Sequence, residues 1–171
     1  MYNVINYCFT HVNDWQASTV RAISIKSVDR IMPGIIKIIT NIATGVAPIT
    51  VATSGGGENC IVVVPGANYE LTASDLTKEL FQNGKIIVCQ NELHHETTQR
   101  ALELGKNMGL TTVYSPAPCP TISEFKSIAS NLDFVLANES EALQLTGASD
   151  IETAATKIND FGVKHAIITL G

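Results

Sequence analysis

Short apolar segments alternate with segments of helical pattern through most of this sequence, and no other feature constrains the fold as strongly. The apolar segments are the length of strands: 85–90, 111–115, 133–137 and 164–170. The segments between them have helix caps and helical spacing: 94–109, 121–131, 139–147 and 151–162. Strands that alternate with helices form a parallel sheet, because each helix returns the chain to the starting edge. We therefore expect an α/β fold, a Rossmann-like, mostly parallel sheet with helices on both faces.

The segment before this regular part follows a different pattern. Residues 46–64 contain two β-rich runs around three consecutive glycines, which predicts an antiparallel hairpin that projects from the sheet as a flap or subdomain. Pro48 has no N–H to donate and is expected on an edge strand. Residues 71–84 are predicted to form one helix, capped by Thr72. The sequence thus predicts three parts: an unassigned N-terminal segment (1–43), a β segment (44–65) and an α/β domain (66–171).

The composition excludes several classes of protein. The chain is 45% hydrophobic and 16% charged with a net charge of −5, which is typical of a globular protein and unfavourable for binding nucleic acid. Its four cysteines are widely spaced and form no C-x-x-C pair. Charged residues interrupt the longest apolar stretch, and the first residues lack the pattern of a signal peptide. We expect a cytoplasmic or nuclear protein with neither nucleic acid nor membrane as partner.

Polar side chains follow three of the predicted strands at the point where each strand ends. They are Gln90-Asn91-Glu92, Asn138-Glu139-Ser140-Glu141 and Thr169-Leu170-Gly171. Ligands of open α/β sheets gather outside the carboxyl ends of the strands. If the strands are parallel, all three groups lie along one rim, and that rim is the predicted ligand site.

The residues Asn138 to Glu141 allow two interpretations. An amide and two acids at the start of a helix are stabilised by the free N–H groups and the helix dipole, which requires no function. Alternatively, Glu141 could hold Mg²⁺ directly or through water while Asn138 binds a phosphate oxygen. The two interpretations are compatible, because a capped turn is also rigid.

Other sites are less well supported. Thr169 and the glycine after Leu170 would let backbone N–H groups approach a phosphate, but an ordinary turn explains them equally well. Glu92 could accept hydrogen bonds from sugar hydroxyls or be a solvated acid. The sequence has no P-loop motif, and the neighbouring His94 and His95 do not share a helix face as metal ligands would.

Taken in order, several stretches resemble the ribokinase-like (PfkB) carbohydrate kinase family. The matching pieces are TGVAPITV, GGGENCIVVVPGAN, IIVCQNE, SPAP, FVLANESEALQLTG and VKHAIITLG, so the resemblance covers residues 44–171. It implies an ATP-dependent kinase that uses Mg²⁺ to convert D-ribose to ribose 5-phosphate. It also implies that the β segment 44–65 is a lid and that two copies pair through this lid as a homodimer. The monovalent cation site of such kinases would lie mostly downstream of this chain.

The resemblance also implies roles for individual residues. Glu92 would bind the sugar, although the residue before it is usually leucine and here is Asn91. Asn138 would contact the phosphates of ATP, and Glu141 would help to hold Mg²⁺. The nucleotide-binding loop would begin with the three residues Thr169, Leu170 and Gly171.

Two departures from the family pattern affect the expected activity. Residues 1–43 lack the glycine-rich sugar-binding segment, and no G-A-G-D motif, whose aspartate is the family's catalytic base, occurs up to Gly171. The resemblance therefore supplies no catalytic residue here. We expect a partial gene product without kinase turnover on its own. The alternatives are a non-catalytic nucleotide-binding or dimerising fragment, and a kinase for another sugar or nucleoside.

Overall fold

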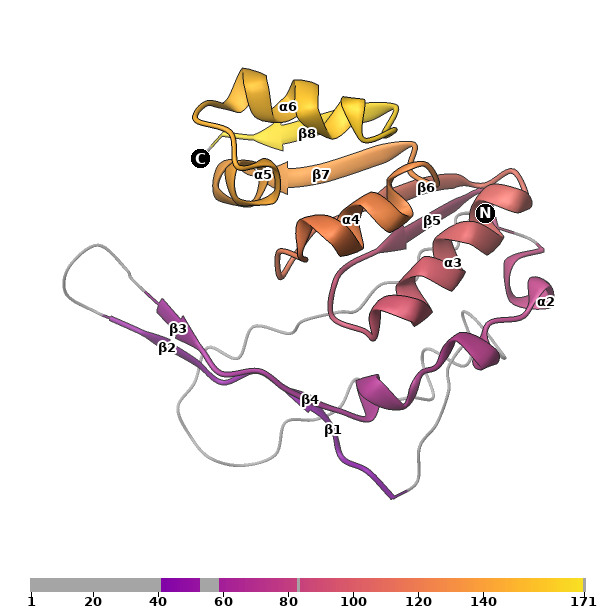
Figure 1. Cartoon of the computed structure of the whole chain (residues 1–171). Helices are drawn as coiled ribbons and strands as arrows, with labels where there is room; N and C mark the ends of the chain where they lie inside the picture. Colours follow the sequence, from indigo (N-terminus) through magenta and orange to yellow (C-terminus); the bar gives the residue numbers. More distant parts are fainter. Residues whose placement is uncertain (1–40, 53–58, 83, 171) are drawn as a thin grey trace.

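The computed structural model describes residues 41–52, 59–82 and 84–170. Its centre is a parallel sheet of four strands in the order β5-β6-β7-β8 (Figure 1). The strands are β5 (Ile86–Cys89), β6 (Thr111–Tyr114), β7 (Phe134–Asn138) and β8 (His165–Thr169). Each of them begins and ends within one residue of the predicted segment. The mostly parallel α/β fold that the sequence predicts is confirmed.

The helices that connect these strands also match the predicted segments. They are α3 (His95–Asn107), α4 (Ile122–Ala129), α5 (Glu139–Thr146) and α6 (Ile151–Asp160). Side chains of Thr121 and Asp150 accept backbone N–H groups at the starts of α4 and α6. After α5 the chain turns at Gly147, whose φ of 61° is a left-handed conformation that glycine adopts without strain.

The main hydrophobic core lies between these helices and one face of the sheet. Leu102, Phe125, Leu145 and Ile158 from the helices pack with Val135 of β7. On the opposite face, Leu136 and Ile167 are 38% and 44% exposed. The predicted cover of helices on both faces is therefore not found at the last strand among the described residues. Its side chains alternate between exposed and half-buried, because the described helices that contact β8 do so on one side.

The predicted single helix over residues 71–84 is wrong. The chain instead forms two short 3₁₀ turns, η1 (Ala67–Glu70) and η2 (Ala73–Asp75), and one turn of helix, α2 (Lys78–Phe81). Thr72 does begin a turn, and its N–H donates to Asp75 Oδ2 at 2.8 Å. The backbone is extended at Leu76 and Thr77, so a second short helix starts there. This segment is held by a second, smaller hydrophobic core, in which Leu76 packs with α2, β5 and α3.

The lid is an antiparallel ribbon in two parts, as the hairpin prediction requires. Strand β1 (Thr44–Val46) pairs with β4 (Val64–Gly66), and β2 (Ile49–Val51) pairs with β3 (Asn59–Ile61). Between the two parts, the carbonyl of Pro48 accepts a hydrogen bond from the N–H of Val62 at 3.1 Å. The glycines at its tip lie outside the described residues. Figure 1 shows the lid extending away from the helices.

The lid leaves its apolar side chains in solvent. The following residues are each about half exposed: Val46, Ile49, Val51, Ile61, Val62, Val63 and Val64. Both strands of such a ribbon are edge strands, whose free backbone groups can pair with another chain.

In the part of the chain that the structure describes, no helix has the length and apolar character needed to cross a membrane.

Candidate functional site

The loops that follow the parallel strands lie along one edge of the sheet, here called the rim. Because β5, β7 and β8 run in the same direction, Glu92, Asn138 and Thr169 all lie at this edge. The register pairs Asn138 directly with Thr169. Leu170 follows Thr169 and is 68% exposed, whereas Gly171 lies outside the described residues. The structure thus places the predicted site residues that it describes on a common edge.

The loop after β5 carries Glu92. The N–H of Asn91 donates to the carbonyl of Ala117 at 3.0 Å, and its side-chain Nδ2 donates to the carbonyl of Pro118 at 2.9 Å. Glu92 is half-buried, and burial raises the pKa of its carboxyl above the ordinary value. Further along, the rings of His94 and Tyr69 lie with their centroids 4.4 Å apart, which joins this loop to the segment that follows the lid.

The loop after β6, residues 115–120, lies between two of the three predicted groups of the rim, the one at Glu92 and the one at Asn138 to Glu141. Its Ala117–Pro118 bond is cis, and both carbonyls of that pair accept from Asn91. At its other end the Cys119 thiol lies 3.8 Å from the carbonyl of Glu141. Burial, and then the negative charge of Glu141, raise the pKa of this thiol. In the sequence, the prolines of this loop indicate rigidity but not its hydrogen-bond partners.

At the start of α5, Asn138 and Glu141 bond to each other. The N–H of Glu141 donates to Asn138 Oδ1 at 2.8 Å, and the N–H of Asn138 donates to Glu141 Oε2 at 2.9 Å. This reciprocal pair is a capping box. The interpretation of these residues as a helix cap is therefore confirmed, and it is compatible with a ligand role. The box leaves out Asn138 Nδ2, which is a donor, and Glu141 Oε1, which is an acceptor. A phosphate and a cation need these two atom types.

The carboxylate of Glu141 could supply only part of the ligand set of a Mg²⁺ ion. Among the described residues, no group of three or more His, Cys, Asp or Glu side chains could hold a metal ion. Mg²⁺ bound to nucleotides is commonly held by one or two carboxylates, with phosphate oxygens and water as its other ligands. A single half-buried carboxylate beside the amide donor of Asn138 is consistent with that arrangement.

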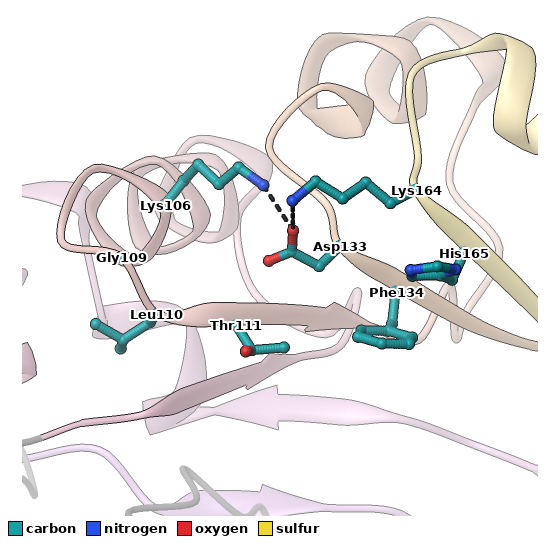
Figure 2. A pocket seen from close by; sticks show the side chains of 8 residues that line it. All are labelled: Lys106, Gly109, Leu110, Thr111, Asp133, Phe134, Lys164 and His165. Atoms are coloured by element: carbon teal, nitrogen blue, oxygen red, sulfur yellow. Dashed lines mark hydrogen bonds and ion pairs between the residues drawn. The ribbon is translucent and has the colours of Figure 1, made fainter.

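The opposite edge of the sheet has a different chemistry, which Figure 2 shows. Asp133 Oδ1 accepts from Lys106 Nζ at 2.8 Å and from Lys164 Nζ at 2.6 Å. Asp133 Oδ2 accepts from the N–H of Thr112 at 2.9 Å and from its hydroxyl at 3.1 Å. We call these four residues the clasp. An open hollow of about 400 Å³ lies beside it, also lined by Phe134 and His165.

The clasp ties together the beginnings of three strands. Burial opposes ionisation of Asp133, but the hydrogen bonds from Lys106, Lys164 and Thr112 outweigh it and hold the pKa of this carboxyl well below its usual range. Asp133 directly precedes β7, Lys164 directly precedes β8, and Thr112 lies in β6. The hollow is therefore at the amino ends of the strands, across the sheet from the rim.

Comparison with known proteins identifies relatives over most of the described chain. The profile of the pfkB family carbohydrate kinases matches residues 34–171. A mouse (Mus musculus) ribokinase is 36% identical over 138 residues, which are 75% of this chain and 41% of that protein. A Salmonella typhimurium deoxyribokinase is 34% identical over 136 residues, which are 75% of this chain and 44% of that protein.

Solved structures agree with the sequence comparison. The chain superposes on a ribokinase from Giardia lamblia with a TM-score of 0.72 and 30% identity, covering 86% of this chain and 49% of that one. This chain thus spans less than half the length of the relatives that it matches.

Proposed function

The chain belongs to the pfkB family of carbohydrate kinases, and we propose that its rim binds a ribose-type sugar and ATP for phosphorylation of the sugar. The observation that carries the proposal is the common edge on which Glu92, Asn138 and Thr169 lie at the carboxyl ends of parallel strands. Relatives that act on ribose and on deoxyribose support a pentose as the substrate class.

Each polar group of the rim has a role in this proposal. Glu92 accepts hydrogen bonds from sugar hydroxyls, for which a half-buried carboxylate is well suited. Asn138 donates through Nδ2 to a phosphate oxygen, and Glu141 holds Mg²⁺ through Oε1 or an intervening water. Backbone N–H groups from Thr169 onward contact the nucleotide. The metal, when bound, neutralises charge on the phosphates, and these side chains fix the positions of the two substrates.

Two substitutions separate the ligand roles of the capping box from its structural role. Asn138→Asp keeps an oxygen that can cap the helix but removes the Nδ2 donor. Glu141→Gln keeps an acceptor for the N–H of Asn138 but removes the charge that Mg²⁺ requires. We expect each variant to fold as the wild type does and to bind ATP–Mg²⁺ about tenfold more weakly or worse, since hydrogen bonds to charged groups contribute about 1.5–3 kcal/mol.

Calorimetric titration of ATP–Mg²⁺ measures this effect, and Asn159→Ala serves as the control because Asn159 is exposed on α6. Unchanged affinity in both rim variants would show that the box is only a helix cap. Loss of affinity in the Asn159→Ala variant as well would show that the measurement reports folding rather than binding.

We further propose that the lid pairs with the lid of a second copy. The exposed valines and isoleucines of its two-stranded ribbon, together with its free strand edges, support a dimer at this place. Sedimentation equilibrium of the wild type and of Ile61→Lys tests it. We expect the substitution to weaken dimerisation, and a monomeric wild type at high concentration would disprove the proposal.

A further inference from the structure

We propose that Asn91 is a positioning residue that fixes the Glu92 carboxylate at the rim for sugar binding. This inference rests on the proposed function, because it assigns a task to the residue beside the sugar-binding acid. It concerns a side chain that differs from the leucine usual at this position of the family.

Asn91 makes two bonds to consecutive carbonyls of one loop. Its N–H donates to Ala117 and its side chain donates to Pro118, at 3.0 Å and 2.9 Å. The receiving loop is itself anchored, since the N–H of Ser115 donates to the carbonyl of Cys89 at 2.9 Å. A residue held at two points has little freedom to rotate, so the direction in which the next residue leaves is also restricted.

Glu92, by contrast, has no hydrogen bond or ion pair with the residues that the structure describes. It is nevertheless half-buried, and its carboxyl therefore loses part of its hydration without a compensating partner. A chain segment with such a group would swing into solvent unless its neighbours held it. The bonds of Asn91 on one side, and the contact between His94 and Tyr69 on the other, supply that restraint.

This arrangement leaves the carboxylate free to accept from a ligand. A carboxylate that was tied to a protein donor would first have to break that bond, whereas one held through its neighbour is preorganised. Leucine in place of Asn91 would keep the backbone bond to Ala117 and lose the bond to Pro118. The side-chain bond is therefore the part of the restraint that this chain's own asparagine adds.

The test compares Asn91→Leu, which keeps the side-chain size, with Asn91→Asp, which keeps the shape but replaces the donor by an acceptor that faces Pro118. Asn107→Ala is the control, because Asn107 is an exposed asparagine at the far end of α3. Three quantities are measured on the full chain: the ribose dissociation constant, the ATP–Mg²⁺ dissociation constant, and the pKa of the Glu92 carboxyl by carbon-13 NMR titration.

We expect both Asn91 variants to raise the ribose dissociation constant about fivefold, as loss of one hydrogen bond predicts, with ATP–Mg²⁺ binding unchanged. In the Asn91→Leu variant, which adds no charge beside Glu92, the pKa of Glu92 should fall towards its ordinary value, because the loosened loop admits water. An unchanged pKa would overturn the inference, and so would equal loss of both ligands, which indicates a general structural role. If the wild type bound no ribose, the proposed function would fail, and the pKa comparison would still decide whether Asn91 positions Glu92.

Discussion

Carboxylate side chains lie at both edges of the parallel sheet, but they differ in how many protein partners they have. At the amino edge, the Asp133 carboxylate accepts hydrogen bonds from Lys106 and Lys164 (Figure 2). It also accepts from the N–H and the hydroxyl of Thr112. At the carboxyl edge, Glu92 has no partner among the described residues, and Glu141 uses only one oxygen in its capping box. A carboxylate with all its partners contributes stability, whereas one with unused acceptors is available to a ligand. The comparison predicts that substitutions at the amino edge mainly change stability, whereas substitutions at the carboxyl edge mainly change ligand binding.

The largest expected effect is on stability at the amino edge. Asp133→Asn removes the negative charge between Lys106 and Lys164 and leaves the N–H of Thr112 with a weaker acceptor. We expect the free energy of unfolding to fall by about 2–4 kcal/mol, because a partly buried charge loses its partner. Urea denaturation measures it. Asp160→Asn is the matched control, since Asp160 is exposed at the end of α6 and should change stability by less than about 0.5 kcal/mol.

The stability difference between the wild type and Asp133→Asn should also depend on pH, in a direction that the pKa of Asp133 sets. The folded-state pKa of Asp133 lies well below its usual range, so the unfolded chain takes up this proton first as the pH falls. The stabilisation is fully present above the unfolded pKa of about 3.9 and is lost as the pH falls towards the folded value. The difference in unfolding free energy between the wild type and Asp133→Asn should therefore be constant near pH 7 and shrink below about pH 4. A difference that stays the same at pH 3 would show that the charge of Asp133 is not what stabilises the edge.

The strand positions and the rim were predictable because they depend on local pattern. Apolar runs fix the strands, and parallel strands must end at one edge, so the common position of Asn138 and Thr169 follows from their place in the sequence. The clasp was not predictable in this way. Lys106, Asp133 and Lys164 are ordinary charged residues in the sequence. Only the packing of α3 against β5 and β6 brings Lys106 to the residues that precede β7 and β8.

The errors also have physical causes. The helix predicted over 71–84 breaks at Leu76 and Thr77, where the backbone is extended, and the burial of Leu76 and Phe81 favours the bend. In the sequence, Asn91 is distinguished only as one of the polar residues after the strand at 85–90 and as a departure from a family pattern. Its bond to Pro118 joins residues that lie 27 positions apart, which spacing alone does not reveal.

A smaller effect on stability is expected at the rim, where the box that opens α5 is partly structural. Asn138→Ala removes the side-chain acceptor for the N–H of Glu141 and should lower the unfolding free energy by about 1 kcal/mol. Asn138→Asp keeps that acceptor and should stay within about 0.5 kcal/mol of the wild type. Thermal or urea unfolding of the pair separates the cap from the ligand role. A loss of several kcal/mol in the aspartate variant would make the rim as structural as the clasp, and the contrast between the edges would fail.

The smallest expected change in stability has the opposite sign. Glu92 is half-buried and has no partner among the described residues, and burial raises its pKa, so ionisation near pH 7 opposes folding. This cost is absent below the unfolded pKa and appears as the pH rises through the folded one. Glu92→Gln should therefore raise the unfolding free energy at pH 7 by on the order of a few tenths of a kcal/mol, a small effect because solvent screens the group, and by nothing at pH 3.

The same variant should bind ribose at least tenfold more weakly, since the sugar hydroxyls lose a charged acceptor. Parallel urea denaturation and calorimetric titration give both numbers on one preparation. A gain in stability together with a loss of sugar binding is what distinguishes an acid kept for a ligand from one kept for the fold. If Glu92→Gln instead destabilised the chain as Asp133→Asn does, Glu92 would have a structural partner, and the two edges would not differ in the way described.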